Sequence, residues 1–189
     1  FDGESASPYR EGDATGPVNV YGQTKLEAEL ALTDIDAPAL VLRTAWVYSL
    51  RRKSFVQTMA ALAAKHATLK VVDDQHGSPT WCRDLAAAIA LIVFRARAAP
   101  HDTMREVSGI YHLAGGGACS RFELVQALVE LHPRRESLAV QQLLPCSSDA
   151  FPLPAARPSY SVLDCSHIRD RLGVTLPPWR DALQRALAD

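Results

Sequence analysis

Residues 39–48 read ALVLRTAWVY, and this stretch decides the fold class. It is bounded by Pro38 and by the charged cluster that begins at Arg51. A run of this length, rich in β-branched and aromatic residues, indicates a strand. Its nearly continuous apolar character is typical of a strand that is covered on both faces. The stretch therefore predicts a largely buried strand in a parallel sheet.

Helical and strand patterns alternate on both sides of this stretch. Pro17 is expected to open a helix that continues to about Leu32. Ser120, with Glu123 three residues later, predicts a capping box at the start of another helix. The other expected elements are helices over 55–65 and 83–97, after 164 and from about 178, and strands over 69–72, 109–114 and 140–144. This alternation predicts an α/β fold with a parallel sheet.

The composition excludes several function classes. The chain has 189 residues, of which 48% are apolar and 22% charged, and its formal net charge is -1. This balance argues against a nucleic acid or a membrane surface held by electrostatics. The longest apolar stretch, residues 85–94, has about half the length of a membrane span. We therefore expect a soluble protein with neither a nucleic-acid nor a membrane partner.

The cysteines and the N-terminus indicate the setting of the chain. The thiols lack C-x-x-C spacing and nearby histidine pairs, so neither a zinc site nor a redox pair is expected. Scattered thiols are typical of a reducing compartment, which favours the cytoplasm. Residues 1–16, rich in Gly, Ser, Pro and charge, are expected to form a surface loop. The chain opens abruptly with FDG, and we interpret this N-terminus as a cut.

Tyr21 and Lys25 form the strongest local motif, on the first predicted helix. Four residues is just over one helical turn, so the phenol and the ammonium project from the same face. An ammonium stabilises a neighbouring phenolate, which brings a phenol into the range of acid–base chemistry. The same lysine can donate to the sugar hydroxyls of a nucleotide. The spacing is also common by chance, so a solvated helix pair is the alternative.

Longer segments, in one order along the chain, resemble a known superfamily. FDG followed by PYREGDATGPVNVYGQTKLEAE resembles the active-site region of extended short-chain dehydrogenases/reductases, and LRTAWVYS resembles the strand that follows it. VVDDQHGSPTWCRDLA resembles the D-Q-x-G-x-P-T segment of the dTDP-4-dehydrorhamnose reductases in that superfamily. GIYHLAGGG, RPSYSVLD and Trp179 continue the same order. The resemblance spans nearly the whole chain and is far more specific than the Tyr-Lys pair.

The resemblance implies a fold and a division of the chain. The fold would be the C-terminal part of a doubly wound, Rossmann-like parallel sheet with a small α/β substrate-binding lobe. Residues 1–50 and 83–118 would be the remainder of the NAD(P)-binding domain, and 51–82 with 119–189 the nucleotide-sugar-binding lobe. The Gly-rich turn that holds the cofactor pyrophosphate would precede Phe1. The GGG that follows the predicted strand at 109–114 is expected to be a tight turn instead.

The resemblance also implies the catalytic and cofactor-binding residues. Tyr21 would be the proton donor, and Lys25 would assist it and contact the nicotinamide ribose of NADPH or NADH. Thr44 would lie beside the cofactor. His112, on a predicted strand, is expected to be a satisfied core histidine with no ligand role.

Three further residues are candidates for binding the dTDP-sugar. The Trp46 indole can stack on a sugar or base and donate one hydrogen bond, although a tryptophan on a buried strand is often a core residue. Gln75 and Arg157 are candidates for the nucleotide end, because a guanidinium fork matches a diphosphate. The alternative for Arg157 is an ion pair with a loop carboxylate. Gly77 and Pro79 are expected to form turns rather than to contact a ligand.

The chain departs from the family pattern at several positions. Ser54 stands where an Asn is usual, so the substrate contact of that Asn cannot be carried over. Arg121 stands where an aromatic residue is common, and Ser49 where a Gly is common. Some members bind Mg²⁺ through acidic residues near the end of the helix before Leu69. This chain has Lys65 and His66 in that region, so no such metal site is expected here.

Taken as a whole, the resemblance implies an oxidoreductase. NADPH or NADH would deliver hydride to C4 of dTDP-4-dehydro-L-rhamnose, while Tyr21 protonates the developing alkoxide. The alternatives are another nucleotide-sugar reductase or epimerase and a non-catalytic binding subunit, against which the presence of Tyr21 and Lys25 argues. Without the Gly-rich turn the 189-residue piece is expected to be inactive alone. The oligomeric state stays open, with a homodimer among the options.

Overall fold

The computed structural model describes residues 1–33, 35, 38–97 and 105–189. The elements in chain order are α1 (Val20–Thr33), β1 (Leu40–Arg43), β2 (Val47–Tyr48), α2 (Phe55–Ala63), β3 (Thr68–Val72), β4 (His76–Gly77), β5 (Thr80–Trp81), α3 (Cys82–Arg97), β6 (Gly109–His112), β7 (Cys119–Ser120), α5 (Arg121–Leu131), η1 (Arg135–Ser137), β8 (Gln142–Cys146), η2 (Ser148–Ala150), β9 (Tyr160–Ser161), α6 (Ser166–Leu172) and α7 (Trp179–Ala188). Each sequence-predicted helix has a counterpart with changed ends in several cases, and so does each predicted strand, except that the one over residues 39–48 is divided into two.

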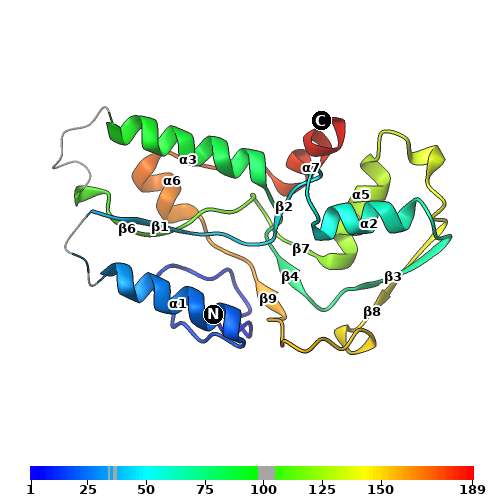
Figure 1. The fold of residues 1–189 in the computed structure, drawn as a ribbon, viewed down its shortest axis with the longest axis horizontal. Helices are drawn as coiled ribbons and strands as arrows, with labels where there is room; N and C mark the ends of the chain where they lie inside the picture. Colours follow the sequence, from blue (N-terminus) through cyan, green and yellow to red (C-terminus); the bar gives the residue numbers. More distant parts are fainter. Residues whose placement is uncertain (34, 36–37, 98–104) are drawn as a thin grey trace.

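Parallel pairing dominates the short sheets. β1 pairs with β6, β2 with β5 and β3 with β8, each in parallel. β4 lies between β7, which is antiparallel to it, and β9, which is parallel. Figure 1 shows the β1–β6 pair between α1 on one side and α3 and α6 on the other, the layering of an α/β fold. The predicted α/β class with parallel strands is confirmed.

The buried side chains form two clusters. The larger one packs α2, α5 and α7 against β3 and includes Val56, Leu128 and Leu183. The smaller one joins α3, β6 and α6 and includes Leu113 and Ile168. In Figure 1 the larger cluster belongs to the right half of the molecule and the smaller one to the left half. The division of the chain into a cofactor domain and a sugar lobe stays a prediction, and α6 packs with the left half.

The expected strand over residues 39–48 is interrupted. β1 ends at Arg43 and β2 begins at Val47, and between them Trp46 has a φ of 43°. This left-handed conformation is uncommon for a residue other than glycine. The chain leaves the β1–β6 pair at this point and joins the β2–β5 pair. The expectation of one continuous strand is therefore wrong, because the turn at Trp46 redirects the chain between two sheets.

The starts of two helices test the capping rules. α1 begins after Pro17, because the Asn19 side chain accepts the N–H of Gly22 at 2.8 Å and so caps the helix. The prediction that Pro17 opens this helix is wrong. At α5 the predicted capping box is confirmed, since the Ser120 hydroxyl accepts the Glu123 N–H at 3.1 Å and Glu123 accepts the Ser120 N–H at 2.7 Å.

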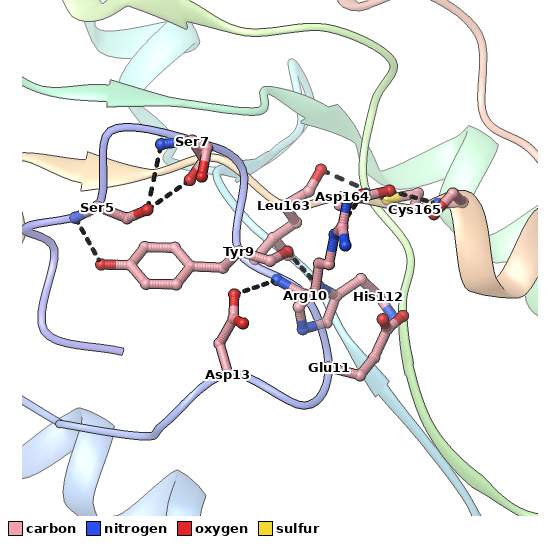
Figure 2. A network of polar contacts seen from close by, with 11 residues as sticks. Ser5, Ser7, Tyr9, Arg10, Glu11, Asp13, His112, Leu163, Asp164 and Cys165 are labelled. Atoms are coloured by element: carbon pink, nitrogen blue, oxygen red, sulfur yellow. Dashed lines mark hydrogen bonds and ion pairs between the residues drawn. The ribbon is translucent and has the colours of Figure 1, made fainter.

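The N-terminal segment is more buried than a surface loop. Tyr9 is only 4% exposed, and Figure 2 shows it within a network of polar contacts. Its N–H donates to Val162 at 2.9 Å, and its carbonyl accepts the N–H of Asp164 at 2.8 Å. Its hydroxyl donates to Asp2 at 2.6 Å and accepts the N–H of Gly3 at 2.9 Å. The surface-loop prediction is therefore wrong for this part of residues 1–16, which is fastened to the chain near β9.

Candidate functional site

An open pocket of about 1110 Å³ lies between the start of α1, the end of β1, the residues before β4 and the loop that leads into β9. Its volume is slightly above the roughly 300–1,000 Å³ of common small-molecule sites. The residues that line it include all six that the sequence singled out, Tyr21, Lys25, Thr44, Trp46, Gln75 and Arg157. The fold thus brings together side chains from both ends of the chain.

Tyr21 and Lys25 stand on successive turns of α1 at the pocket. The Lys25 ammonium nitrogen lies 5.5 Å from the centroid of the Tyr21 ring. Tyr21 is 72% exposed. Neither side chain forms a hydrogen bond or an ion pair with the residues that the structure describes. The phenol and the ammonium are therefore both available to a molecule bound in the pocket.

An ion pair holds α1 against the end of β1. Arg43 Nη2 donates to a carboxylate oxygen of Glu29 at 2.6 Å, and Arg43 Nε lies 3.0 Å from both oxygens. The two side chains are only 14% and 17% exposed, so solvent screens the pair less than it screens a surface pair. Glu29 follows Lys25 by one turn of α1. Arg43 therefore fixes the helix that carries Tyr21 and Lys25.

Thr44 and Trp46 stand where the chain leaves β1. Thr44 directly follows the strand and is exposed at the pocket. Ligands of open parallel sheets bind at this carboxyl end of the strands. The Trp46 carbonyl accepts the N–H of Thr80 at 3.2 Å, which anchors the left-handed turn to β5. The Trp46 side chain packs against the larger core cluster and also lines the pocket, so it has the core role, and its role in binding the sugar nucleotide stays a prediction.

Gly77 allows the Trp46 indole to approach the backbone closely. A Cβ atom at position 77 would lie 2.3 Å from Trp46 Cε2, closer than non-bonded atoms can approach. Gly77 lies in β4, paired on both sides by strands, and not in a turn. The prediction that it forms a turn is wrong, because glycine is needed here for the space it leaves to the indole.

Arg121, the first residue of α5, extends over the same indole. Its guanidinium carbon lies 3.8 Å from the Trp46 ring centroid and 4.6 Å from that of Phe55. Both distances are within the range of favourable cation–π contacts. The backbone N–H of Arg121 donates to the Gln75 carbonyl at 3.1 Å, which joins α5 to the residues before β4. Arg121 also lines the pocket.

The surroundings of Arg121 disfavour the positive charge on its guanidinium. Burial lowers the pKa of Arg121 to about 10, and the nearby Arg157 guanidinium acts in the same direction. The sequence identified Arg121 only as a departure from the family pattern and missed it as a pocket residue. One signal was available, because a cation in the first turn of a helix opposes the helix dipole.

Arg157 lies in an exposed loop that is tied to both ends of the pocket wall. The Asn19 amide donates to the Ala156 carbonyl at 2.8 Å, and the Ser159 hydroxyl donates to the Gly3 carbonyl at 2.8 Å. Arg157 forms no ion pair within the described part of the chain. The structure therefore does not support the alternative that Arg157 only pairs with a loop carboxylate.

His112 is buried behind the pocket, beside the N-terminal segment (Figure 2). Its Nδ1 lies 3.0 Å from the Tyr9 carbonyl, which can only accept, so Nδ1 carries the proton. Its backbone N–H donates to Glu11 at 2.7 Å. Burial lowers the pKa of His112, and the Glu11 carboxylate opposes this effect. Nε2 has no partner among the described residues, so the expected satisfied core histidine is satisfied at one ring nitrogen only.

The described residues contain no group of three or more His, Cys, Asp or Glu side chains that could hold a metal ion. Across the same residues, no helix has the length and the apolar character that crossing a membrane requires.

Fold and pocket together define a class of protein. Parallel strands with flanking helices, a pocket at the end of β1 and a Tyr-x-x-x-Lys pair on its wall are the features of the short-chain dehydrogenase/reductase type. Within this class the chain belongs to the RmlD substrate binding domain family, whose model matches residues 1–189.

Named relatives and solved structures agree with this assignment. The dTDP-4-dehydrorhamnose reductase of Burkholderia thailandensis is 40% identical over 195 residues, which cover 100% of this chain and 64% of that protein. The crystal structure of a dTDP-4-dehydrorhamnose reductase from Clostridium acetobutylicum has a TM-score of 0.85 at 32% identity and is covered to 61%. One from Bacillus anthracis, in complex with NADP, has a TM-score of 0.84 at 29% identity and is also covered to 61%. Both structures match 100% of this chain, which therefore spans less than two thirds of the length of these relatives.

Proposed function

We propose that the protein is an NADPH- or NADH-dependent oxidoreductase that reduces dTDP-4-dehydro-L-rhamnose to dTDP-L-rhamnose. The observation that carries the proposal is the placement of Tyr21 and Lys25 in one pocket with Trp46, Gln75 and Arg157. The first two side chains suit the chemistry at a sugar carbonyl, and the other three suit a nucleotide sugar. The names of the relatives support the same reaction.

The residues on the α1 side of the pocket fit a nicotinamide cofactor. The Lys25 ammonium has no hydrogen-bond or ion-pair partner among the described residues, so it can donate to ribose hydroxyls. The Thr44 hydroxyl is exposed at the carboxyl end of β1, where ligands of parallel sheets bind. When bound, the cofactor supplies the hydride that reduces the C4 carbonyl. The relative from Bacillus anthracis was solved with NADP, which supports this part of the proposal.

Tyr21 gives the proton that completes the reduction. Its phenol is exposed at the pocket, and the ammonium of Lys25 lies beside its ring. A positive charge at this place stabilises the phenolate that remains once the proton has moved to the sugar oxygen. The Arg43–Glu29 ion pair keeps the helix in position for this transfer. Tyr21 is therefore the general acid and Lys25 its electrostatic partner.

The opposite wall binds the nucleotide sugar. Trp46 offers its indole beside the Arg121 guanidinium that lies over the ring, and Gln75 offers an amide for hydrogen bonds to polar groups of the ligand. Arg157 offers a guanidinium that no described carboxylate occupies. These three side chains hold the substrate while Tyr21 acts on its C4 oxygen.

The test is a reductase assay of the complete protein with NADPH and dTDP-4-dehydro-L-rhamnose. Tyr21→Phe removes only the proton donor, so turnover should fall about 10²–10⁴-fold, as is usual for a positioned general acid. Tyr48→Phe is the matched control, because the Tyr48 hydroxyl is buried outside the pocket and has no hydrogen-bond partner among the described residues. It should keep nearly the parental rate.

The same assay separates the alternatives. Parental turnover by Tyr21→Phe would remove Tyr21 from the mechanism. If the protein converts other sugar nucleotides but not this one, the reaction is that of another reductase or an epimerase. If it binds sugar nucleotides and converts none of them, the protein is a binding subunit.

We also propose a cytoplasmic location, because all four cysteines are free, as is usual in a reducing compartment. A homodimer stays a prediction, which light scattering on the complete protein can check.

A further inference from the structure

Two positively charged side chains line the pocket without a negative partner among the described residues. They are Arg121 and Arg157, and the charge on Arg157 contributes to the lowered pKa of Arg121. In the part of the chain that the structure describes, neither guanidinium forms an ion pair. Like charges that are brought together in this way repel each other, most strongly where burial lowers the local dielectric. The arrangement is unfavourable unless an anion joins it.

The position of Arg121 in α5 adds to this imbalance. A cation in the first turn of a helix faces the positive end of the helix dipole. The acidic side chain of that turn, Glu123, accepts the backbone N–H of Ser120 at 2.7 Å and so serves the helix cap. Arg121 thus combines burial, a neighbouring cation and an unfavourable helix position. Local conflicts of this kind are expected at functional sites.

The Arg121 guanidinium contacts two aromatic rings. It lies 3.8 Å from the Trp46 ring centroid and 4.6 Å from that of Phe55, and the close approach of Gly77 restrains the indole in turn. A guanidinium has its N–H groups in its own plane, so contacts made through its face leave those groups free to form a fork of hydrogen bonds with a ligand. Preorganisation of this kind lowers the entropy lost when a ligand binds.

We propose that Arg121 determines substrate specificity: together with Arg157 it binds the diphosphate of a nucleoside diphosphate sugar. This inference rests on the proposed function, which assigns a sugar nucleotide to the pocket. A diphosphate supplies the negative charge that the pair lacks, and its oxygens match the forks of two guanidinium groups. Arg121 therefore selects sugars that carry a nucleoside diphosphate over free sugars.

The test is calorimetric titration of the complete protein with dTDP and, separately, with thymidine, which lacks the phosphates. Arg121→Gln should raise the Kd for dTDP by about 10- to 100-fold, the size of a lost charge-assisted hydrogen-bonded contact. The Kd for thymidine should change less than about twofold. Arg121→Lys should recover only part of the loss, because it keeps the charge and loses the fork. Arg52→Gln, an equal loss of charge at an exposed site outside the pocket, is the matched control and should change neither Kd.

Arg157→Gln guards against a folding defect in the Arg121 variants. Arg157 lies in an exposed loop, so its replacement should leave the thermal melt unchanged and still raise the Kd for dTDP severalfold. The proposal is overturned if Arg121→Gln, folded as judged by its melt, binds dTDP as well as Arg52→Gln does. It is also overturned if thymidine and dTDP are weakened equally, since Arg121 would then only support Trp46.

The reductase assay separates this inference from the proposed function. Tight binding of dTDP that depends on Arg121, in a protein that reduces no dTDP-sugar, would leave the diphosphate site standing and remove the reaction. Normal reduction by a protein whose dTDP affinity does not depend on Arg121 would leave the reaction standing and remove the diphosphate site.

Discussion

The two halves of the molecule bury their apolar side chains to different extents. The closed half, made of α2, β3, α5, β8 and α7, is packed around the larger core cluster, whereas the open half, made of α1, β1, α3, β6 and α6, has the smaller one. Large apolar side chains are exposed on α1 and α3, including Leu32, Val93 and Phe94. Among the described residues, none of the exposed large apolar side chains lies on an element of the closed half.

The helices that carry the pocket residues are therefore held in place in two different ways. Tyr21 and Lys25 come from the open half, where the Arg43–Glu29 ion pair positions their helix. Arg121 comes from the closed half, where a complete apolar core holds α5. Contiguous exposed apolar surface marks a face that makes contacts. The closed half therefore supplies most of the buried core, and the open half carries the two residues to which we assign the proton transfer.

The largest effect should come from cutting into the closed core. Leu128→Ala removes a side chain that is 1% exposed on α5, and it should cost about 2–5 kcal/mol in free energy of unfolding. Phe94→Ser, at 72% exposure on α3, should change this free energy by less than about 0.5 kcal/mol. Denaturant titration of the 189-residue chain measures both, with the slope against denaturant as the control for two-state behaviour. Equal costs would break the comparison between the halves.

The same two substitutions in the complete protein would sharpen the comparison. If Phe94→Ser then costs as much as a core substitution, other residues of the protein cover α3. If its cost stays small, the surface of α3 is open there too.

A medium effect should come from Gly77→Ala, where the two halves meet. The added methyl group collides with Trp46, so the indole must shift, at a cost of about 1–3 kcal/mol in free energy of unfolding. The KM for the sugar nucleotide should rise as well. Gly12→Ala is the matched control, because a Cβ there meets nothing within 4 Å. Thermal melts and tryptophan fluorescence measure the outcome, and identical behaviour of the two variants would mean that Trp46 is not held by this contact.

The smallest effect concerns the pH dependence of the open half. Burial lowers the pKa of His112 in the folded protein below the roughly 6.5 of an unfolded histidine. The unfolded chain therefore binds the proton more tightly, so the stability from neutral His112 is complete above about pH 6.5 and is lost as the pH falls towards the folded pKa. The loss cannot exceed about 1.4 kcal/mol per pH unit.

Denaturant titrations between pH 5 and 7.5 measure this dependence, at roughly the range where histidine titrates. His112→Gln should lose the decline below about pH 6.5, whereas the exposed His66→Gln should follow the parental curve. If the free energy of unfolding of His112→Gln falls with pH in parallel with that of the parent, His112 is not the source of the pH dependence.

Local sequence signals were sufficient for most of the fold. The capping box at Ser120 and Glu123 and the apolar pattern of α3 depend on residues close in sequence, and both predictions are confirmed. The turn at Trp46 was not foreseen, because a left-handed conformation at a tryptophan has no local signature. Its causes, the bond from Thr80 and the space above Gly77, come from residues that are distant in sequence.

The residues of the candidate site also divide into those that local sequence predicts and those that it does not. The Tyr21–Lys25 pair follows from helical spacing, and the other pocket residues came from the resemblance to a family. Arg121 was missed because the resemblance placed an aromatic residue at its position. The burial of Tyr9 was missed because the partners of its backbone groups lie more than a hundred residues further along the chain.

These long-range bonds at Tyr9 and Asn19 set an order of events during synthesis. Tyr9 forms a bridge with Leu163, and Asn19 bonds the carbonyl of Ala156. The ribosome makes α1 well before the loop that faces it, since Asn19 and Ala156 are 137 residues apart. Contacts of large sequence separation also form slowly. We therefore expect the nascent chain to display Tyr21 and Lys25 in solvent until that loop has been made, with the pocket completed only then.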